Sequence, residues 1–429
     1  MNRVLRAWGA TSWLWGLAAA AMLAVTAVFL IRTVASYKLI YLGEGESAIG
    51  LSAAAFAILP LFATMWLGRL SDQLASFRFA IAFGALVIGL GGACVAWAST
   101  AAAVIMASAI LGIGQTTFAV CAQSAITRLA PSQRLDASFG SFTAALSLGQ
   151  MFGPLLSGLL LGNASLSMST VQAAAADSIA IALWVGVVIS CAAAPVILFS
   201  KLDGRRQLGP GAQTAARGRG SKAARPDAKR GPGAKGPSIL KILKVSGVPS
   251  QVAAAMALLS ILDILTAFLP LVGEERGVSP FCIGILLAVR GGASFISRIF
   301  LPMLIKKWSR ETLLLASLLG SAAAVALLPL VLDWFWLAVL LMSLGGCLLG
   351  LGQPMTMTMI SQAVPAAWRG AALALRLMGN RVGQVVFPVV AGVVASPLGP
   401  SGALWFACAV MAGAGAQRLV QDRHGGTDL

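Results

Sequence analysis

Residues 149–160 of the chain read GQMFGPLLSGLL, and residues 383–394 read GQVVFPVVAGVV. The two stretches lie 234 residues apart and share four residues at equivalent places, namely Gly149 and Gly383, Gln150 and Gln384, Pro154 and Pro388, and Gly158 and Gly392. Glycine in a membrane helix lets neighbouring backbones approach closely, and proline is tolerated there because neighbouring groups satisfy the carbonyl that it frees. Two such segments at matched places predict a duplicated bundle of membrane helices.

The composition indicates an all-α membrane protein with several spans. The chain has 429 residues, of which 58% are hydrophobic and 10% are charged, with a mean hydropathy of +0.88. A soluble domain is roughly 45–50% apolar and about 25% charged. The formal net charge is +17, but the basic residues lie in short loops beside apolar spans, which is the positive-inside pattern of membrane proteins. The lipid bilayer is therefore the expected partner, and nucleic acid is not.

No metal site or cofactor is expected. The only histidine, His424, lies in the C-terminal tail, and no cysteines are paired at the spacing of metal ligands. Each cysteine falls in an apolar stretch and is expected to be a small buried hydrophobic residue. No cleavable signal peptide is expected, because the first apolar run continues to the length of a span. The six cysteines are Cys94, Cys121, Cys191, Cys282, Cys347 and Cys408.

Windows of about 20 mostly apolar residues predict twelve helical spans. Six lie on either side of a central segment at 201–244, which is basic, rich in Gly and Pro, and too polar to support a packed core. The predicted organisation is a six-helix bundle at 1–200, a disordered cytoplasmic linker at 201–244, and a second six-helix bundle with a short tail at 245–429. The spans are expected at 16–42, 47–67, 79–98, 101–125, 137–161, 178–200, 249–272, 280–303, 312–332, 335–360, 371–395 and 401–420.

Lys and Arg alternate between successive loops, with Arg276 as the clear exception, so both termini are expected to be cytoplasmic. The Ala- and Gly-rich composition and the short loops are typical of a bacterial inner membrane. The linker is expected to be a plain connection, although its basic residues could also rest on anionic lipid or serve regulation.

The chain resembles the major facilitator superfamily over nearly its full length, in its twelve predicted spans, its two related halves and its basic central segment. In that fold two parallel repeats of six helices enclose a binding site near the membrane midplane. The resemblance implies a secondary transporter that works by alternating access. It also implies a small-molecule solute as substrate, and a monomer is expected.

The residues after the second predicted span resemble the superfamily's loop signature. Gly68, Asp72 and Arg78 match it, whereas Gln73 replaces a basic residue and Ala75 replaces a glycine. An aspartate at a cytoplasmic helix end can accept hydrogen bonds from a facing helix N-terminus and can pair with arginine. The loop is therefore expected to hold one gate state closed, with a solvated loop charge as the alternative.

The first of the two glycine-rich stretches is similar to the Gly-Pro signature in the fifth span of the superfamily's exporters. Gly149, Gly153, Pro154 and Gly158 carry the match. The resemblance implies a role in helix packing and an export function. Exporters with this signature often have an arginine four residues before the glycine that is Gly112 here, but this chain has Ser108. Proton coupling through an arginine at that position is therefore not expected.

Ionisable residues in mid-span cost about 2.5–3.5 kcal/mol each on insertion scales, so each indicates a functional or a paired structural site. The predicted solute and proton pathway consists of Arg32, Tyr37, Asp263, Arg290, Arg376, Asn380 and Arg381. Asn380 and Arg381, together with the repeat-related pair Gln150 and Gln384, could contact the solute or join helices. The excess of arginine over aspartate favours an anionic or carboxylate-bearing solute.

The repeat predicts which of these charges meet. Leu42-Gly43-Glu44 aligns with Val272-Gly273-Glu274 at an offset of 230, which matches Asp263 with Thr33, the neighbour of Arg32. The first and seventh spans of the resembled fold face each other, so Arg32 and Asp263 are expected at a similar depth. Two interpretations remain open. Either Asp263 is a proton-binding carboxylate, and Arg32 controls its protonation or binds the solute, or the two residues form a permanent ion pair.

The leading function is proton-coupled efflux of a small organic solute by an antiporter-type mechanism. Import of an organic anion is the alternative, and the direction of flux under a proton gradient separates the two. A membrane-embedded transferase normally uses a histidine, a carboxylate pair or a metal cluster, and none is evident. No enzyme activity is therefore expected. A receptor that does not transport remains open, and a measured flux decides that question.

Overall fold

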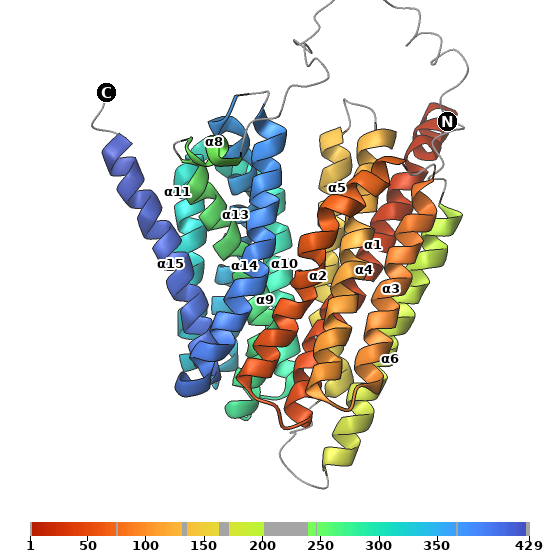
Figure 1. Ribbon diagram of the computed structural model, residues 1–429, viewed down its shortest axis with the longest axis vertical. Coiled ribbons are helices and arrows are strands. Elements are labelled where there is room, and N and C mark those ends of the chain that lie inside the picture. The colour runs from red at the N-terminus through yellow and green to blue at the C-terminus, as the bar shows by residue number, and fades with distance from the viewer. Residues whose placement is uncertain are drawn as a thin grey trace, which may run out of the picture.

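The computed structural model describes the backbone of residues 2–73, 76–130, 135–162, 171–200, 239–245, 247–365 and 368–425 (Figure 1). The described chain is helical, and the helices form two side-by-side bundles. The first bundle consists of α1 (Asn2–Tyr41), α2 (Glu46–Gln73), α3 (Phe77–Trp97), α4 (Ala101–Leu129), α5 (Leu135–Leu161) and α6 (Val171–Phe199). The all-α fold class is thereby confirmed.

The second bundle begins with the short helix α8 and contains the remaining spans. The ninth span of the chain, which lies in this bundle, is not one regular helix. A π-helical turn interrupts it, and a 3₁₀ turn ends it. The elements are α8 (Ile239–Leu243), α9 (Val248–Glu275), α10 (Pro280–Lys307), α11 (Arg310–Leu315), η3 (Ala316–Gly320), α12 (Ser321–Leu327), η4 (Leu328–Leu330), α13 (Phe335–Ala363), α14 (Arg369–Leu398) and α15 (Pro400–Gly425).

Eleven helical stretches among the described residues are long and apolar enough to cross a membrane, and they match the first eleven predicted spans in order. The twelfth predicted span falls within α15, which is not among them; the side chains of α15 from residue 420 onward lie outside the description. Helix α15 nevertheless packs against α9 and α14 and runs alongside the second bundle (Figure 1). The start of α1 and the end of α15 lie at the same end of the molecule (Figure 1).

Several helices continue beyond the predicted spans. The second span was expected to end at residue 67, but α2 runs to Gln73 and α3 begins at Phe77. Gly68 and Asp72 are therefore part of a helix rather than of a loop. A hydropathy window finds the apolar part of a helix, whereas backbone hydrogen bonding continues into the polar part.

The predicted linker at 201–244 lies outside the described residues as far as residue 238. Its last part, which was expected to be disordered, forms α8 instead. The reason is local hydrophobicity: Ile242 is buried in a small cluster with Val248, Val364 and Ala372 of the second bundle. Lys241 lies within α8, and Lys244 follows its last residue.

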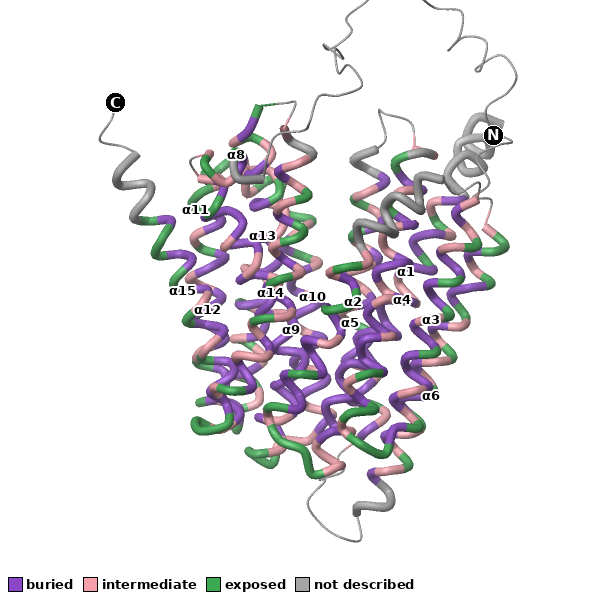
Figure 2. The backbone as a smooth tube through the Cα atoms, in the orientation of Figure 1, coloured by how far each residue is buried: buried purple, intermediate pink, exposed green. Residues whose placement is uncertain are grey.

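The first membrane-spanning helix of each bundle, α1 or α9, is the most buried of its bundle. In the most apolar stretch of each span, 78% of residues are buried in α9 and 67% in α1, compared with at most 61% in the other spans. Figure 2 shows the buried positions gathered along the inner helices and the exposed positions on the outside. Large exposed side chains such as Phe62, Phe79 and Trp336 give the outer surface the apolar character that a bilayer requires.

The two bundles repeat one another at an offset of 234 residues. Gly43 and Gly277, which end α1 and α9, both have positive φ, 77° and 66°. The offset of 230 expected for these helices is therefore wrong by about one helical turn. Gly149 packs on the backbone of Met22 in α1, and its counterpart Gly383 packs on Met256 in α9.

The first of two seams between the bundles joins α5 and α10 at the end opposite the termini. A Cβ atom added to Gly284 would lie 2.6 Å from the Pro154 carbonyl oxygen and 2.7 Å from the Cα atom of Gly158. The backbone N–H of Phe281 also donates to the carbonyl of Gly162 at 3.1 Å. Because real Cβ atoms do not approach so closely, glycine is required for this contact.

The second seam joins α2 and α14 and repeats the first. A Cβ atom added to Gly50 would lie 2.5 Å from the Pro388 carbonyl oxygen and 3.2 Å from the Cα atom of Gly392. Gly50 and Gly284 are 234 residues apart, as are the two Pro-Gly pairs that they contact. The sequence repeat is thus expressed as a pair of equivalent seams between the bundles.

The terminal helix α15 is fastened to α9 by a buried arginine. Arg418 donates to the Ser250 hydroxyl at 3.2 Å and, with the amide of Gln251 oriented to accept, to the Gln251 side-chain oxygen as well. Hydrogen bonds to charged groups contribute about 1.5–3 kcal/mol each. Replacing Arg418 with Gln is expected to destabilise the protein by about 2 kcal/mol, seen as a lower thermal unfolding midpoint in detergent, and an unchanged midpoint would contradict this assignment.

Candidate functional site

A buried ion pair joins the two bundles at their centre. Arg32 of α1 donates from Nη1 to Oδ1 of Asp263 in α9 at 2.6 Å, and both side chains are 8% exposed. The expected proximity of these two residues is found although the offset of 230 is wrong. A shift of one turn moves a residue by about 5.4 Å along the same helix face, which an arginine side chain can span.

The ion pair is one end of a polar chain that crosses between the bundles twice. The second oxygen of Asp263 accepts a hydrogen bond from Gln384 Nε2 of α14 at 2.7 Å. Arg381 of α14 donates to Gln384 Oε1 at 3.1 Å and to the Thr116 hydroxyl of α4 at 3.3 Å. Both oxygens of Asp263 are therefore occupied, and the first bundle supplies a partner at each end of the chain.

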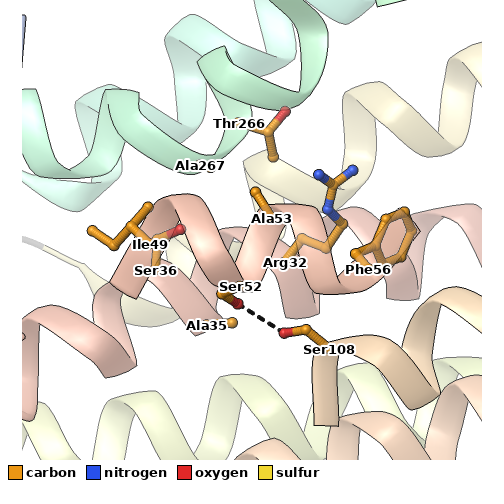
Figure 3. Close-up of a pocket in the computed structure, with 10 residues that line it drawn as sticks. All are labelled: Arg32, Ala35, Ser36, Ile49, Ser52, Ala53, Phe56, Ser108, Thr266 and Ala267. Atoms are coloured by element: carbon orange, nitrogen blue, oxygen red, sulfur yellow. Dashed lines mark hydrogen bonds between the residues drawn. The ribbon is translucent and has the colours of Figure 1, made fainter. Parts of the chain in front are cut away.

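A small pocket lies beside Arg32 between α1, α2, α4 and α9, and Figure 3 shows its lining. The Arg32 guanidinium carbon lies 4.2 Å from the centre of the Phe56 ring, a cation–π contact. Ser52 and Ser108 share a hydrogen bond of 2.8 Å in the same pocket. Ser108 is neutral, and the cation of this pocket is Arg32 of α1.

Two of the predicted pathway residues lie inside the second bundle. Arg376 of α14 donates to Gln353 Oε1 at 2.6 Å and to the Thr356 hydroxyl, both on α13. Asn380 lies one turn further along α14 and is 5% exposed, and its side-chain oxygen has no hydrogen-bond partner among the described residues. In this conformation Arg376 joins helices rather than facing the other bundle.

Arg290 of α10 is the most deeply buried arginine of the described chain, at 1% exposure. Its Nε and Nη2 atoms have no hydrogen-bond partner among the described residues. Asp263 and Arg298 are the charged groups that act on it electrostatically. Arg298 itself crosses between the bundles and donates to the Ser147 hydroxyl of α5 at 2.7 Å.

Tyr37 was expected to face the cavity, but it is 2% exposed and is not part of the pocket lining. Its hydroxyl is buried without a partner among the described residues, near Glu274 and Cys282 of the second bundle. The ring is held in the core because it lies where α1 meets the other bundle.

The predicted gate residues are only partly described. Gly68 and Asp72 lie in the part of α2 whose side chains are outside the description, and Arg78 lies in the first turn of α3, over the Phe79 ring at 4.8 Å. Of the repeated stretches, Pro154, Gly158, Pro388 and Gly392 lie in the two seams. The other glycines, Gly149, Gly153 and Gly383, pack on the first spanning helix of their own bundle. Gln150 belongs to the α5–α10 contact, because its carbonyl faces Gly291 of α10.

Sequence reasoning missed Thr116, Gln353, Phe56 and Ser52. Residues of these types also occur in membrane helices without a functional role, so their identity alone does not mark them as site residues. One signal was available: Thr116 follows the Gly-x-Gly-Gln motif at 112–115, which repeats at 350–353. The described residues contain no group of three or more His, Cys, Asp or Glu side chains that could hold a metal ion.

Comparison with known proteins gives one family and many structures. A family model described as the Major Facilitator Superfamily matches residues 17–333 and 252–425. No curated protein matches the chain significantly. The solved structure of a D-xylose-proton symporter has 14% identity and a TM-score of 0.72, and it covers 95% of this chain and 97% of its own.

Two further solved structures have the same fold. The nucleoside transporter NupG has 13% identity and a TM-score of 0.69, covering 95% of this chain and 98% of its own. A bacterial homologue of the human lysosomal transporter Spinster, in an inward-facing and unoccupied conformation, has 15% identity and a TM-score of 0.68, covering 96% and 95%. At these identities the structures share the fold of this chain, and no more is carried over from them.

Proposed function

This chain belongs to the major facilitator superfamily, and from that membership we propose that it is a secondary active transporter that exports a small organic solute in exchange for protons. As a member of this family it is a multi-pass membrane transport protein and not an enzyme. The finer parts of the proposal are the proton coupling, the direction and the site residues. Each has its own support and its own test.

The observation that carries the proposal is the Arg32–Asp263 ion pair between the bundles. Alternating access requires the bundles to move relative to one another about a central site. A residue pair that joins them across the centre must break or rearrange when they move. A carboxylate that gains and loses an adjacent cation in a dry environment alternately favours its ionised and its protonated form.

We assign Asp263 the role of proton acceptor and Arg32 the role of its competing cation. When the bundles separate at this level, Arg32 leaves with α1 and a proton replaces it on Asp263. When the bundles return, Arg32 displaces the proton. Gln384 holds the second oxygen of Asp263 from within the same bundle, so the carboxylate keeps its orientation throughout.

The export direction is supported by the resemblance of the α5 stretch to the exporters' signature and by its place in the α5–α10 seam. With the termini taken as cytoplasmic and the protein as a monomer in an inner membrane, the seams close the side away from the cytoplasm. The second and third spans then meet at the cytoplasmic side, where Asp72 and Arg78 are proposed as a gate contact.

The test is flux in proteoliposomes that contain the purified full-length chain. Inverted and right-side-out vesicles are loaded with a panel of labelled organic solutes, and a proton gradient of either sign is imposed. We expect one orientation to expel solute as protons enter, with loss of the effect when the gradient is dissipated. Accumulation in the direction of proton flow would instead establish proton-driven import, and the absence of any flux would leave a receptor.

A further inference from the structure

Three arginines of the described chain act on Asp263, the carboxylate that joins the two bundles. Arg32 is bonded to Asp263, and both Arg290 and Arg381 act on it electrostatically. With Asp263 ionised, this cluster of three cations and one anion has a net charge of +2. Uncompensated charge in a low-dielectric interior is costly, so such a cluster favours occupation by negative charge.

Arg290 offers an unoccupied binding edge to that charge. Its two nitrogens without partners, Nε and Nη2, are the pair that lie along one edge of the guanidinium plane and donate in parallel. This edge fits the two oxygens of a carboxylate in the bidentate arrangement that arginine favours. Asp263 does not fill it here, because Arg32 and Gln384 already occupy both of its oxygens.

The other cations of the site are already engaged. Arg32 is bound to Asp263, and Arg381 reaches Gln384 and Thr116. Among the described residues, the side-chain oxygen of Asn380 on α14 and the side-chain nitrogen of Gln353 on α13 are also buried without a hydrogen-bond partner. Within the cluster, Arg290 is the arginine whose buried donors lack a partner among the described residues.

We propose that the transported solute is a small organic carboxylate and that its carboxylate binds the Nε–Nη2 edge of Arg290. This inference rests on the proposed transport function and adds the class of the solute to it. Arg290 is carried by α10 and Asp263 by α9, so the solute site and the proton site belong to one bundle. The bound anion offsets the excess positive charge of the cluster, and a neutral or cationic solute does not.

The test measures binding separately from transport. The purified full-length protein is heated in detergent with benzoate or succinate as probes, and with benzamide, succinamide or benzylamine as matched neutral and cationic compounds. At concentrations far above the dissociation constant, a ligand of the folded state raises the unfolding midpoint. We expect a carboxylate-specific rise of at least about 3 °C, given the usual relation between stability and midpoint.

The variants decide whether Arg290 is the ligand. Arg290→Gln removes the charge and the fork, and we expect it to weaken carboxylate binding at least about tenfold. Arg290→Lys keeps the charge without the fork and should retain part of the effect. Arg418→Gln is the matched control, because it removes another buried arginine outside the cluster; its unfolding midpoint falls, but its carboxylate-induced rise should remain.

Equal shifts with the amides, no shift with either carboxylate, or a full shift in Arg290→Gln would each overturn the assignment. The same preparation in proteoliposomes separates this inference from the proposed function. Carboxylate binding without any flux contradicts the transport proposal and leaves the anion site in place. Flux of a neutral or cationic solute, without carboxylate binding, supports transport and overturns the anion site.

Discussion

Replacing Asp263 with Asn is expected to abolish proton-driven accumulation of solute, lowering it at least about 100-fold, while downhill exchange of solute continues. Asn keeps the size of the side chain but cannot bind and release a proton. The change also leaves Arg32 buried opposite a neutral group, and removing one partner of a buried pair costs about 3–5 kcal/mol. The measurement is uptake or efflux in proteoliposomes with and without an imposed proton gradient.

A double substitution separates the proton role from a purely structural ion pair. Arg32→Gln combined with Asp263→Asn restores neutrality and is expected to recover most of the lost stability. If Asp263 only pairs with Arg32, the double variant should also recover coupled transport, which would refute the proton role. Asp333→Asn is the matched control, because this exposed aspartate pairs with Arg276 outside the central site.

Replacing Gly284 with Leu is expected to hold the end opposite the termini open and to lower transport about 10–100-fold. The added side chain meets the backbone of Pro154 and Gly158 only when the α5–α10 seam is closed. Overpacking of this kind costs about 1–3 kcal/mol. Because this cost applies only to the conformation in which the seam is closed, it shifts the equilibrium between the closed and the open conformation toward the open one. The equivalent change at Gly50 should act in the same way through the second seam.

The native thiol of Cys282 reports on this shift, because it lies in the first turn of α10 beside the seam. In a variant with the other five cysteines replaced, a membrane-impermeant maleimide should label Cys282 faster after Gly284→Leu. Gly413→Leu is the control, since nothing lies within 4 Å of a Cβ atom there. Unchanged labelling together with normal flux would show that the seam does not open during transport.

The sequence predicted the architecture because its determinants are local. Span length, apolar composition and the Gly-Pro repeat are each readable in one segment. The meeting of Arg32 and Asp263 was also predictable, since an error of one turn leaves a residue on the same helix face. The glycines Gly43 and Gly277 would have corrected that error. Helices commonly end at a glycine with positive φ, so these two glycines mark equivalent helix ends.

The rest of the site could not be read from the sequence, because it depends on how helices face one another. Arg376 and Arg381 lie five residues apart on α14, yet one contacts α13 of its own bundle and the other reaches Thr116 of the opposite bundle. Tyr37 carries a polar hydroxyl and is still buried in the core. The rotation of each helix about its own axis decides which neighbour a side chain contacts, and hydropathy does not specify that rotation.

The two seams close through backbone atoms of glycine and proline, and their tightness depends on shape rather than on charge. Dispersion contacts of this kind respond weakly to salt or acidity, whereas the ion pair at the centre responds to both. Chemical conditions on the far side of the membrane should therefore influence the closed end only indirectly. We expect the signal that opens it to originate at the central ion pair and to reach the seams through the helices that carry them.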